Sequence, residues 1–377
     1  MVPLLAIPAV LALENGRFFP GRIFGATGTS LGEVVFQTGM TGYQETLTDP
    51  SYRGQIVVQT ATQIGNTGWN DEDGESSAIQ VAGYVVRDPS RAVPHWRSVR
   101  PLEAELVRQG VVGLAGVDTR SLTRHLREHG VMRAGVFSGD ALADPAGMTA
   151  AVLNGPAMTG AELASRVSTR RPYVYPAAGP RRFRVAVVDL GLKTGTLRML
   201  AALGVESHVL PDATGADGLL ATEPDGVLLS NGPGDPAAMD HVVALTRSVL
   251  ERRLPLFGIC FGNQILGRAL GRDTYKMRYS HRGINVPVVD AADGRVAITS
   301  HNHGFAVRGE PGERFETPYG PAVVSHHCPN DGTVEGLRCL EVPAFSVQYH
   351  PEAAAGPHDA SALFSAFVGS LRPGGRR

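Results

Sequence analysis

One cysteine of this sequence lies in a setting suited to nucleophilic chemistry. Cys260 stands in the run Gly258-Ile259-Cys260-Phe261-Gly262, after an apolar segment and before a helix-like one. This is the cysteine counterpart of the nucleophile elbow, a tight strand-to-helix turn that exposes its central side chain. The N-terminus of the following helix favours the thiolate over the thiol. The alternative is a buried structural cysteine, which is how we interpret Cys328 and Cys339, since neither has such a setting.

A histidine and a glutamate near the end of the chain could serve such a nucleophile. His350 and Glu352 follow the strand-like run 345–349. Side chains two positions apart leave a strand on the same face, so Glu352 can accept from one imidazole nitrogen while the other faces a sulfur. The loop Gly232-Pro233-Gly234 follows another apolar run and could offer backbone donors to an oxyanion. Taken alone, these features could also be a capped strand end and a plain turn.

The second half of the sequence predicts a scaffold that can bring these segments together. Apolar strand-like runs alternate with helical ones, which indicates right-handed crossovers and a mostly parallel sheet of an α/β domain. In such sheets the functional site lies beyond the carboxyl ends of the strands. The expected strands are 183–191, 205–210, 226–230 and 254–260, with helices over 194–202 and 239–251.

The first half predicts a smaller, β-rich α/β domain. Short strand-like runs are broken by glycine and proline, and Asn15-Gly16 predicts a first hairpin. Helical stretches are expected over 101–109 and from 118 onward. Glycine and proline then interrupt the pattern, so we expect a domain over 1–145, a linker over 146–182 and a second domain over 183–377.

Length and composition exclude several classes of protein. With 377 residues, the chain can form two domains with cores of their own. Its 35 basic and 36 acidic residues lack the basic footprint of nucleic-acid binding. No apolar run reaches the roughly 18 residues of a membrane span. The apolar first thirteen residues lack the Lys or Arg that precedes the apolar region of an export signal, so we expect a cytoplasmic protein. No carboxylate or thiolate lies at a fitting spacing from the histidines 301, 303, 326 and 327, so no metal is expected.

Several motifs resemble known families. GICFGNQ (258–264), NGPGDP (231–236) and QYHPE (348–352) are similar to the motifs of class I, or triad, glutamine amidotransferases. Four segments of the first half resemble the N-terminal domain of the carbamoyl phosphate synthetase small-subunit family: 39–45, 48–52, 64–66 and 116–120. The resemblance covers nearly the whole chain and is weakest at about 141–182 and 308–335.

The resemblance implies a role for each matching residue. Cys260 would be the nucleophile, His350 the general acid and base, and Glu352 its orienter. Phe261 and Asn263 depart from the family, where many members carry Leu and His. Phe261 would act through its backbone N–H, and Asn263 is expected to face away from the substrate. The residues that would hold L-glutamine are Ser51, Gly232, Gly234, Phe261, Gln264, Asn302, Gly304 and Phe305.

The resemblance also implies a partner. Ammonia from glutamine would pass to a large subunit that uses ATP and Mg and combines ammonia with bicarbonate into carbamoyl phosphate, for arginine and pyrimidine biosynthesis. The chain ends at Arg377 without a synthetase portion, so a separate partner chain and a hetero-oligomer are expected, with no cofactor on this chain. One alternative is a free-standing cysteine hydrolase acting on γ-glutamyl bonds or peptides, which leaves the first 140 residues unexplained. Another is a non-catalytic regulatory subunit, which the complete set of Cys260, His350 and Glu352 argues against.

Overall fold

The computed structural model describes residues 7–372 and divides into two compact units. The first unit ends at Ala161 and the second begins at Glu162. This boundary lies inside the segment 146–182 expected to link two domains. The early part of that segment forms helix α4 (Pro145–Leu153), whose Met148 and Val152 pack against Ala12 and Phe137 of the first unit.

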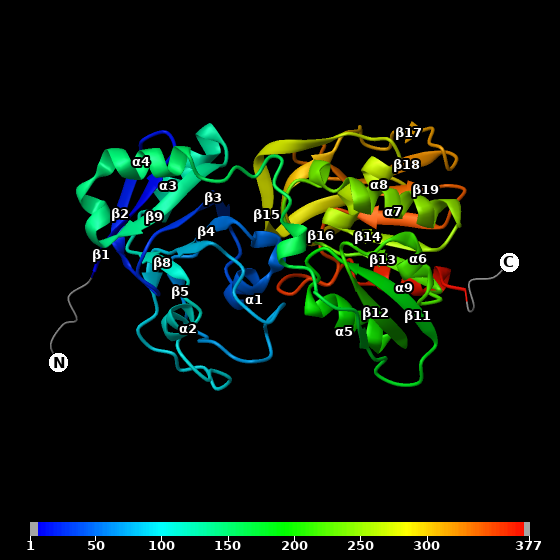
Figure 1. Ribbon diagram of the computed structural model, residues 1–377, viewed down its shortest axis with the longest axis horizontal. Coiled ribbons are helices and arrows are strands. Elements are labelled where there is room, and N and C mark those ends of the chain that lie inside the picture. The colour runs from blue at the N-terminus through cyan, green and yellow to red at the C-terminus, as the bar shows by residue number, and fades with distance from the viewer. Residues whose placement is uncertain (1–6, 373–377) are drawn as a thin grey trace. The chain divides into compact units, whose positions relative to one another are not determined.

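The first unit is a closed barrel with the strand order β1-β2-β8-β6-β4-β3-β9 (Figure 1). Strands β3, β4, β6 and β8 pair in parallel, while β1, β2 and β9 pair antiparallel with their neighbours. The barrel strands are β1 (Pro8–Leu13), β2 (Phe18–Ile23), β3 (Ser30–Gln37), β4 (Gln55–Gln59), β6 (Gly83–Val85), β8 (Val112–Ala115) and β9 (Met132–Ser138). Around them lie α1 (Tyr43–Thr48), η1 (Pro50–Tyr52), the pair β5 (Gln63–Ile64) and β7 (Asp88–Pro89), α2 (Leu102–Arg108), α3 (Thr119–His129) and η2 (Gly139–Ala143).

The hairpin predicted at the start of the chain is confirmed. Strands β1 and β2 pair antiparallel, and the turn at Asn15-Gly16 is closed by a bond from Leu13 N to Arg17 O of 2.9 Å. Gly16 has a φ of 81°, a conformation that glycine adopts without steric cost. Residues 1–6, part of the apolar start of the sequence, lie outside the described residues.

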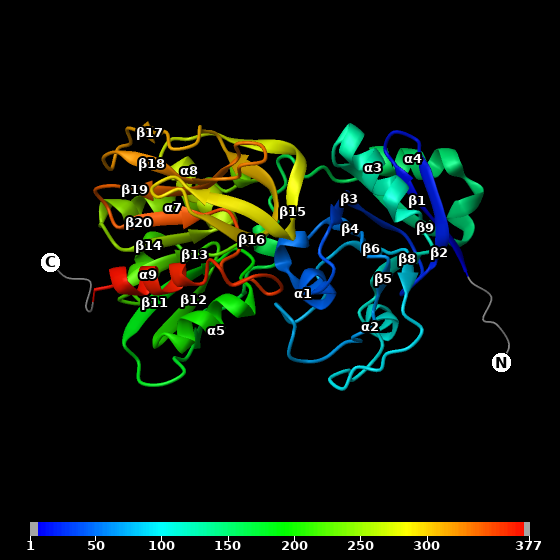
Figure 2. The same cartoon turned by 180° about the vertical axis from the view of Figure 1, so that it is seen from behind.

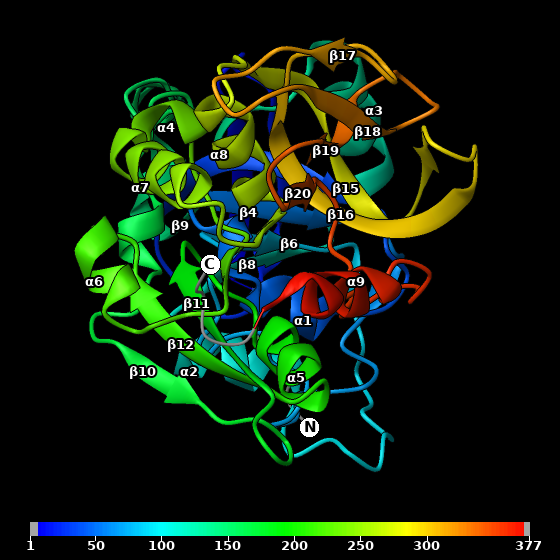
Figure 3. The same cartoon turned by 90° about the vertical axis from the view of Figure 1, so that its right-hand side faces the viewer.

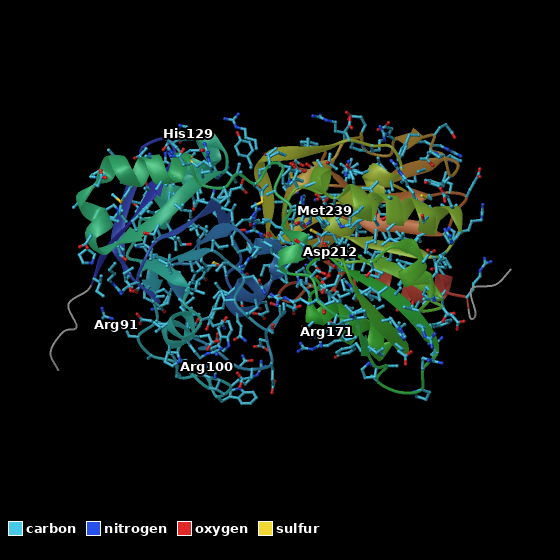
Figure 4. The ribbon with its side chains drawn as sticks, in the orientation of Figure 1. Arg91, Arg100, His129, Arg171, Asp212 and Met239 are labelled. Atoms are coloured by element: carbon cyan, nitrogen blue, oxygen red, sulfur yellow. The ribbon has the colours of Figure 1, made fainter. Side chains whose placement is uncertain are left out.

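Helix α2 carries a buried carboxylate that is fully paired. The Glu105 side chain is inaccessible to solvent and accepts hydrogen bonds from Arg100, Arg108 and Gln109; Arg100 is labelled in Figure 4. The hydrogen bond from Arg108, opposed by burial, lowers the pKa of Glu105 to about 2. Glu105 therefore links Arg108 and Gln109, at the end of α2, to Arg100 in the segment that precedes the helix.

The second unit is built on one large mixed sheet. Its order is β10-β12-β11-β13-β14-β20-β19-β18-β15-β16, with β17 paired to β18. The strands from β12 to β20 are parallel, as the sequence predicts, whereas those from β19 to β16 are antiparallel. The strands are β10 (Tyr173–Tyr175), β11 (Phe183–Asp189), β12 (Val205–Pro211), β13 (Gly226–Leu229), β14 (Leu256–Ile259), β15 (Thr274–Asp290), β16 (Val296–Val307), β17 (Arg314–Phe315), β18 (Ala322–His327), β19 (Val334–Cys339) and β20 (Ala344–Val347).

Helices cover both faces of the parallel strands, which explains why those strands read as continuous apolar runs. Helices α5 and α9 pack on one face and α7 and α8 on the other (Figure 3). The antiparallel part contains a long ribbon of β15 and β16, visible in yellow in Figure 2. The helices of this unit are α5 (Thr194–Ala202), α6 (Ala216–Leu220), α7 (Asp240–Glu251), α8 (Phe261–Ala269) and α9 (Ala362–Ser370), with short turns η3 (Ala164–Arg166) and η4 (Pro236–Ala238). Within residues 7–372, every helix is too short or too polar to cross a membrane.

Candidate active site

Cys260 occupies a strained turn between β14 and α8. Its φ of 54° and ψ of −98° lie in a region that side chains other than glycine rarely adopt. The backbone N–H of Cys260 donates to Val347 O at 2.8 Å, which fastens the turn to β20. A Cβ at Gly258 would lie 2.6 Å from Gly262 O, and one at Gly262 would lie 2.3 Å from Leu229 O. Both glycines are therefore required by close backbone approach, as the elbow interpretation predicts.

His350 and Glu352 lie beyond the end of β20, next to the end of β14. The His350 ring is buried, and its Nδ1 lies 2.6 Å from Glu352 Oε1. Burial by itself would lower the pKa of His350, but the neighbouring Glu352 carboxylate and Cys260 sulfur outweigh it and raise the pKa to about 10. The Nε2 atom has no hydrogen-bond partner among residues 7–372, which leaves it available to the sulfur or to a substrate.

Lys193 is a functional contact that the sequence analysis missed. Its Nζ lies 3.1 Å from Glu352 Oε1 and donates to Ala354 O at 3.0 Å, and the side chain is 3% exposed. Burial would raise the pKa of Glu352, yet the charges of Lys193 and His350 lower it to about 2. Glu352 is therefore an anion held between two cationic groups. The sequence feature that could have drawn attention to Lys193 is the rarity of lysine, since Lys193 and Lys276 are the two lysines of the chain.

Gln348 is a second residue whose part the sequence analysis did not recognise, although it lies inside the QYHPE motif. Its Nε2 lies 3.6 Å from Cys260 Sγ, and its Oε1 accepts from Asn263 at 3.1 Å and from Gln264 at 3.2 Å. Asn263 in turn accepts from Ser346 at 2.9 Å. Hydrogen bonds among these side chains therefore connect the first turn of α8 to β20 and to Gln348 beside the sulfur.

The glycine loop after β13 is fixed next to the elbow. A Cβ at Gly232 would lie 2.1 Å from Leu190 O, and Gly234 has a φ of 98°. Asn231 donates to Gly191 O at 2.8 Å, while Gly262 N donates to Ser230 O at 3.1 Å. These bonds join the loop to both the end of β11 and the start of α8.

The predicted glutamine-binding residues of the second unit lie on three segments around the elbow: the loop after β13, helix α8 and strand β16. The remaining predicted residue, Ser51, belongs to the first unit. Strand β16 passes close to the elbow, with Asn302 O 3.7 Å from Cys260 Sγ and Phe305 O accepting from Gln264 at 2.9 Å. Gly304 lies between these two positions on the same strand. Ser51 is buried in η1, where its N–H donates to Asp49 at 2.9 Å.

A carboxylate lies close in space to the histidines of β16, although none lies at a fitting spacing along the chain. Glu335 of β19 is fully buried, with its oxygens 3.6 Å from His301 Nδ1 and 3.8 Å from His303 Nε2. His281 of β15 lies against the same carboxylate at 3.0 Å. Residues more than 30 positions apart are joined here by the antiparallel strands that the sequence did not predict.

Comparisons with known proteins agree with this geometry. Residues 186–370 match the family Glutamine amidotransferase class-I, and residues 11–136 match Carbamoyl-phosphate synthase small chain, CPSase domain. The carbamoyl phosphate synthase small chain of Mycobacterium tuberculosis (strain CDC 1551 / Oshkosh) is 62% identical over 98% of this chain and 99% of its own. Those of Streptomyces avermitilis and Corynebacterium diphtheriae are 61% identical (98% of this chain, 97% of the relative) and 55% identical (96% of each).

The fold of the second unit and the elbow with its His–Glu pair define a class I glutamine amidotransferase domain. Such a domain implies glutamine hydrolysis. With the match of the first unit and the identity across nearly the whole length, the chain belongs to the carbamoyl phosphate synthase small chain family.

Proposed function

We propose that this chain hydrolyses L-glutamine through a glutamyl thioester on Cys260. The observation that carries the proposal is the elbow itself, where the buried sulfur lies next to His350, which Glu352 orients. The Cys260 thiolate attacks the carbon of the side-chain amide and forms the S–C bond. His350 gives its proton to the departing ammonia, and then takes one from the water that cleaves the thioester.

The negative oxygen of the tetrahedral intermediate needs donors that are in place before the reaction. The N–H of Phe261 opens helix α8, where the helix has no carbonyl of its own to accept it. A second N–H comes from the loop Gly232–Gly234, fixed next to the elbow. One such donor contributes about 2.7–4 kcal/mol to catalysis in other hydrolases.

Glutamine itself is held by groups around the elbow. Gln264 of α8 and Asn302, Gly304 and Phe305 of β16 lie beside the elbow, and the contacts of Gln264 with Phe305 O and of Cys260 Sγ with Asn302 O support this assignment. Ser51 of the first unit completes the proposed set, together with Gly232, Gly234 and Phe261.

The released ammonia goes to a partner. Free ammonia would be protonated and diluted in bulk water, so a direct route to a synthetase is expected. We propose that the partner is a large subunit that binds ATP and Mg and makes carbamoyl phosphate from bicarbonate for arginine and pyrimidine biosynthesis in the cytoplasm. The relatives named as small chains support this hetero-oligomer.

The replacement Cys260→Ser tests the division of labour. In the complex with the large subunit, it should abolish glutamine-dependent synthesis and leave synthesis from added ammonium unchanged, because the sulfur serves only amide cleavage. Cys339→Ser, which also replaces a buried cysteine of the second unit, is the matched control and should keep both activities. Loss of ammonium-dependent synthesis in a stably folded Cys260→Ser protein would overturn the proposal.

A further inference from the structure

The side chains behind the substrate strand form a compact cluster of imidazoles and one carboxylate. Successive residues of a strand point to opposite faces, so His301 and His303 share the face opposite to that of the Asn302 side chain. His281 from β15 and Glu335 from β19 meet them there, and ligand atoms of all four residues lie within 4.8 Å of one another. The side chains of His301, His303 and Glu335 are at most 1% exposed.

The outward nitrogen of each imidazole already has a partner. His303 Nδ1 donates to Phe305 O at 2.9 Å, and His281 Nε2 donates to Asp331 at 2.9 Å. His301 Nε2 lies 2.7 Å from the Thr299 hydroxyl, which gives its own proton to Val286 O at 2.9 Å. With its proton on Val286 O, the hydroxyl accepts from His301 Nε2. Metal-binding histidines show this pattern, with the second nitrogen donating to a carboxylate, carbonyl or hydroxyl.

In the neutral rings of His301 and His303, the inward nitrogens consequently carry lone pairs that face each other. His301 Nδ1 and His303 Nε2 are 3.2 Å apart, and with these tautomers no proton lies between them. Glu335 Oε2 has no hydrogen-bond donor among residues 7–372. Two facing lone pairs beside a buried carboxylate, which His281 Nδ1 contacts at 3.0 Å, repel one another unless a proton or a cation lies between them.

The separations of the inward atoms, counting both oxygens of Glu335, bracket the edge lengths of a four-coordinate site. They are 3.0 Å from His281 Nδ1 to Glu335 Oε1, 3.6 Å from His301 Nδ1 to Glu335 Oε2 and 3.8 Å from His303 Nε2 to Glu335 Oε1. A tetrahedron with bonds of about 2.0–2.2 Å has edges of roughly 3.3–3.6 Å. Three imidazoles with one carboxylate suit zinc, whereas Mg and Ca prefer oxygen ligands throughout.

We propose that His281, His301, His303 and Glu335 bind a structural zinc ion. The cation would carry two positive charges against the carboxylates of Glu335 and Asp331. Four protein ligands leave no open position for a water, so the site is structural and takes no part in amide cleavage. It would fasten β16 to β15 and β19, and so hold the backbone of Asn302 and Phe305 in place beside the elbow.

Metal binding by the native chain tests the proposal directly. Protein stripped with a chelator and titrated with Zn²⁺ or Co²⁺ should take up one ion per chain at submicromolar free metal. Co²⁺ should give the intense visible absorption of four-coordinate geometry, and Zn²⁺ should raise the melting temperature because it binds the folded state alone. No uptake at micromolar free metal would overturn the proposal. In that case the cluster holds protons, with Thr299 donating to His301 and His281 charged between Glu335 and Asp331.

Variants assign the ligands. Glu335→Gln and His301→Gln should each weaken Co²⁺ binding at least 100-fold and remove the four-coordinate spectrum. His241→Gln on α7 is the control for loss of a histidine elsewhere, and Cys328→Ser tests the neighbouring set His281, Cys328 and Asp331. Unchanged binding in Glu335→Gln, or loss in Cys328→Ser, would contradict the assignment. If a variant does not fold, the spectrum and stoichiometry of the native chain still decide the question.

Discussion

At the scale of single residues, the site is a set of buried groups of alternating charge. Lys193, Glu352 and His350 follow one another toward the Cys260 sulfur, and each carboxylate contact is close to 3 Å or shorter. Burial alone would favour the neutral forms of His350 and Glu352, but their mutual attraction and the charge of Lys193 beside Glu352 favour the charged forms. His350 with a pKa of about 10 therefore carries its proton at neutral pH and can give it to departing ammonia.

Removing the carboxylate should show this coupling. Glu352→Gln keeps a hydrogen-bond acceptor for the imidazole but removes the charge, so the pKa of His350 should fall. The rate of glutamine hydrolysis should also fall, by less than the roughly 10²–10⁴-fold loss expected for His350→Asn, because the general acid remains. NMR titration of the labelled imidazole and glutaminase assays measure the two effects. Glu341→Gln, at an exposed glutamate of the same unit, is the control; an unchanged pKa in Glu352→Gln would contradict the coupling.

The site residues that lie in local motifs could be recognised from the sequence. Those whose partners lie far away along the chain could not. Cys260 and its two glycines could be recognised because strand, turn and helix are contiguous. Lys193 could not, because it follows β11 whereas its partner Glu352 follows β20, and only the parallel order of β11, β13, β14 and β20 brings them near. Glu335 was missed for the same reason, since spacing along the chain does not report antiparallel neighbours.

At the scale of elements, two backbone contacts decide where the nucleophile lies. Helix α8 begins directly against β13, with Gly262 in contact with Leu229. The loop before it is held to β20 through the Cys260 N–H. The alternating pattern of strands and helices predicted this part of the fold, whereas closure of the first unit into a barrel depends on pairing between β1 and β9, about 120 residues apart, which no local pattern records.

Adding one methyl group at the start of α8 should displace the elbow. In Gly262→Ala the new Cβ would clash with Leu229 O, so the free energy of unfolding should fall by about 1–3 kcal/mol. Because a misplacement of 1 Å can lower a rate about 100-fold, glutaminase activity should fall by more than 10-fold in the folded variant. Gly369→Ala in α9, where nothing lies within 4 Å of the new Cβ, is the control and should lower neither stability nor activity. Full activity in Gly262→Ala would show that the helix can shift without cost.

Helix α2 offers a test of pH-dependent stability. The pKa of Glu105 is lowered in the folded state to about 2 from about 4.5, so its contribution is complete above pH 4.5 and is lost as the pH falls toward 2. Glu105→Gln should therefore reduce the free energy of unfolding by about 1–3 kcal/mol at neutral pH, and the difference from the native chain should shrink between pH 4.5 and 2. Thermal melts across this range provide the measurement. Glu103→Gln, an exposed position on the same helix, should show little effect, and a difference independent of pH would exclude the ionic explanation.

At the scale of the whole molecule, the two units divide the residues proposed to bind glutamine. All of those residues except Ser51 belong to the second unit, which also holds the nucleophile. The first unit matches its own family over residues 11–136, and its barrel contains its own hydrophobic cores. A contribution of Ser51 to glutamine binding would therefore be a property of the intact chain and not of the amidotransferase unit alone.

Replacing Ser51 tests that contribution. Ser51→Ala should raise the KM for glutamine several-fold with little change in kcat, because it removes an interaction made equally in the ground and transition states. The isolated second unit, residues 162–377, should bind glutamine poorly for the same reason. Steady-state kinetics of the intact variant and calorimetry of the fragment provide the measurements, with Ser76→Ala as a control within the first unit. An unchanged KM would confine the first unit to binding the partner.

Because the chain has two lysines, chemical modification of their amines can report opening of the protein around the active site. Lys193 is buried against Glu352, while Lys276 is partly exposed over the Phe305 ring. An amine-reactive reagent should modify Lys276 directly and Lys193 only when the protein around the active site opens. The ratio of the two modified peptides in a mass spectrum, followed over time, then measures how often that opening occurs. Glutamine or a partner chain that stabilises the closed site should lower the rate of Lys193 modification relative to Lys276. The measurement needs no label engineered into the protein.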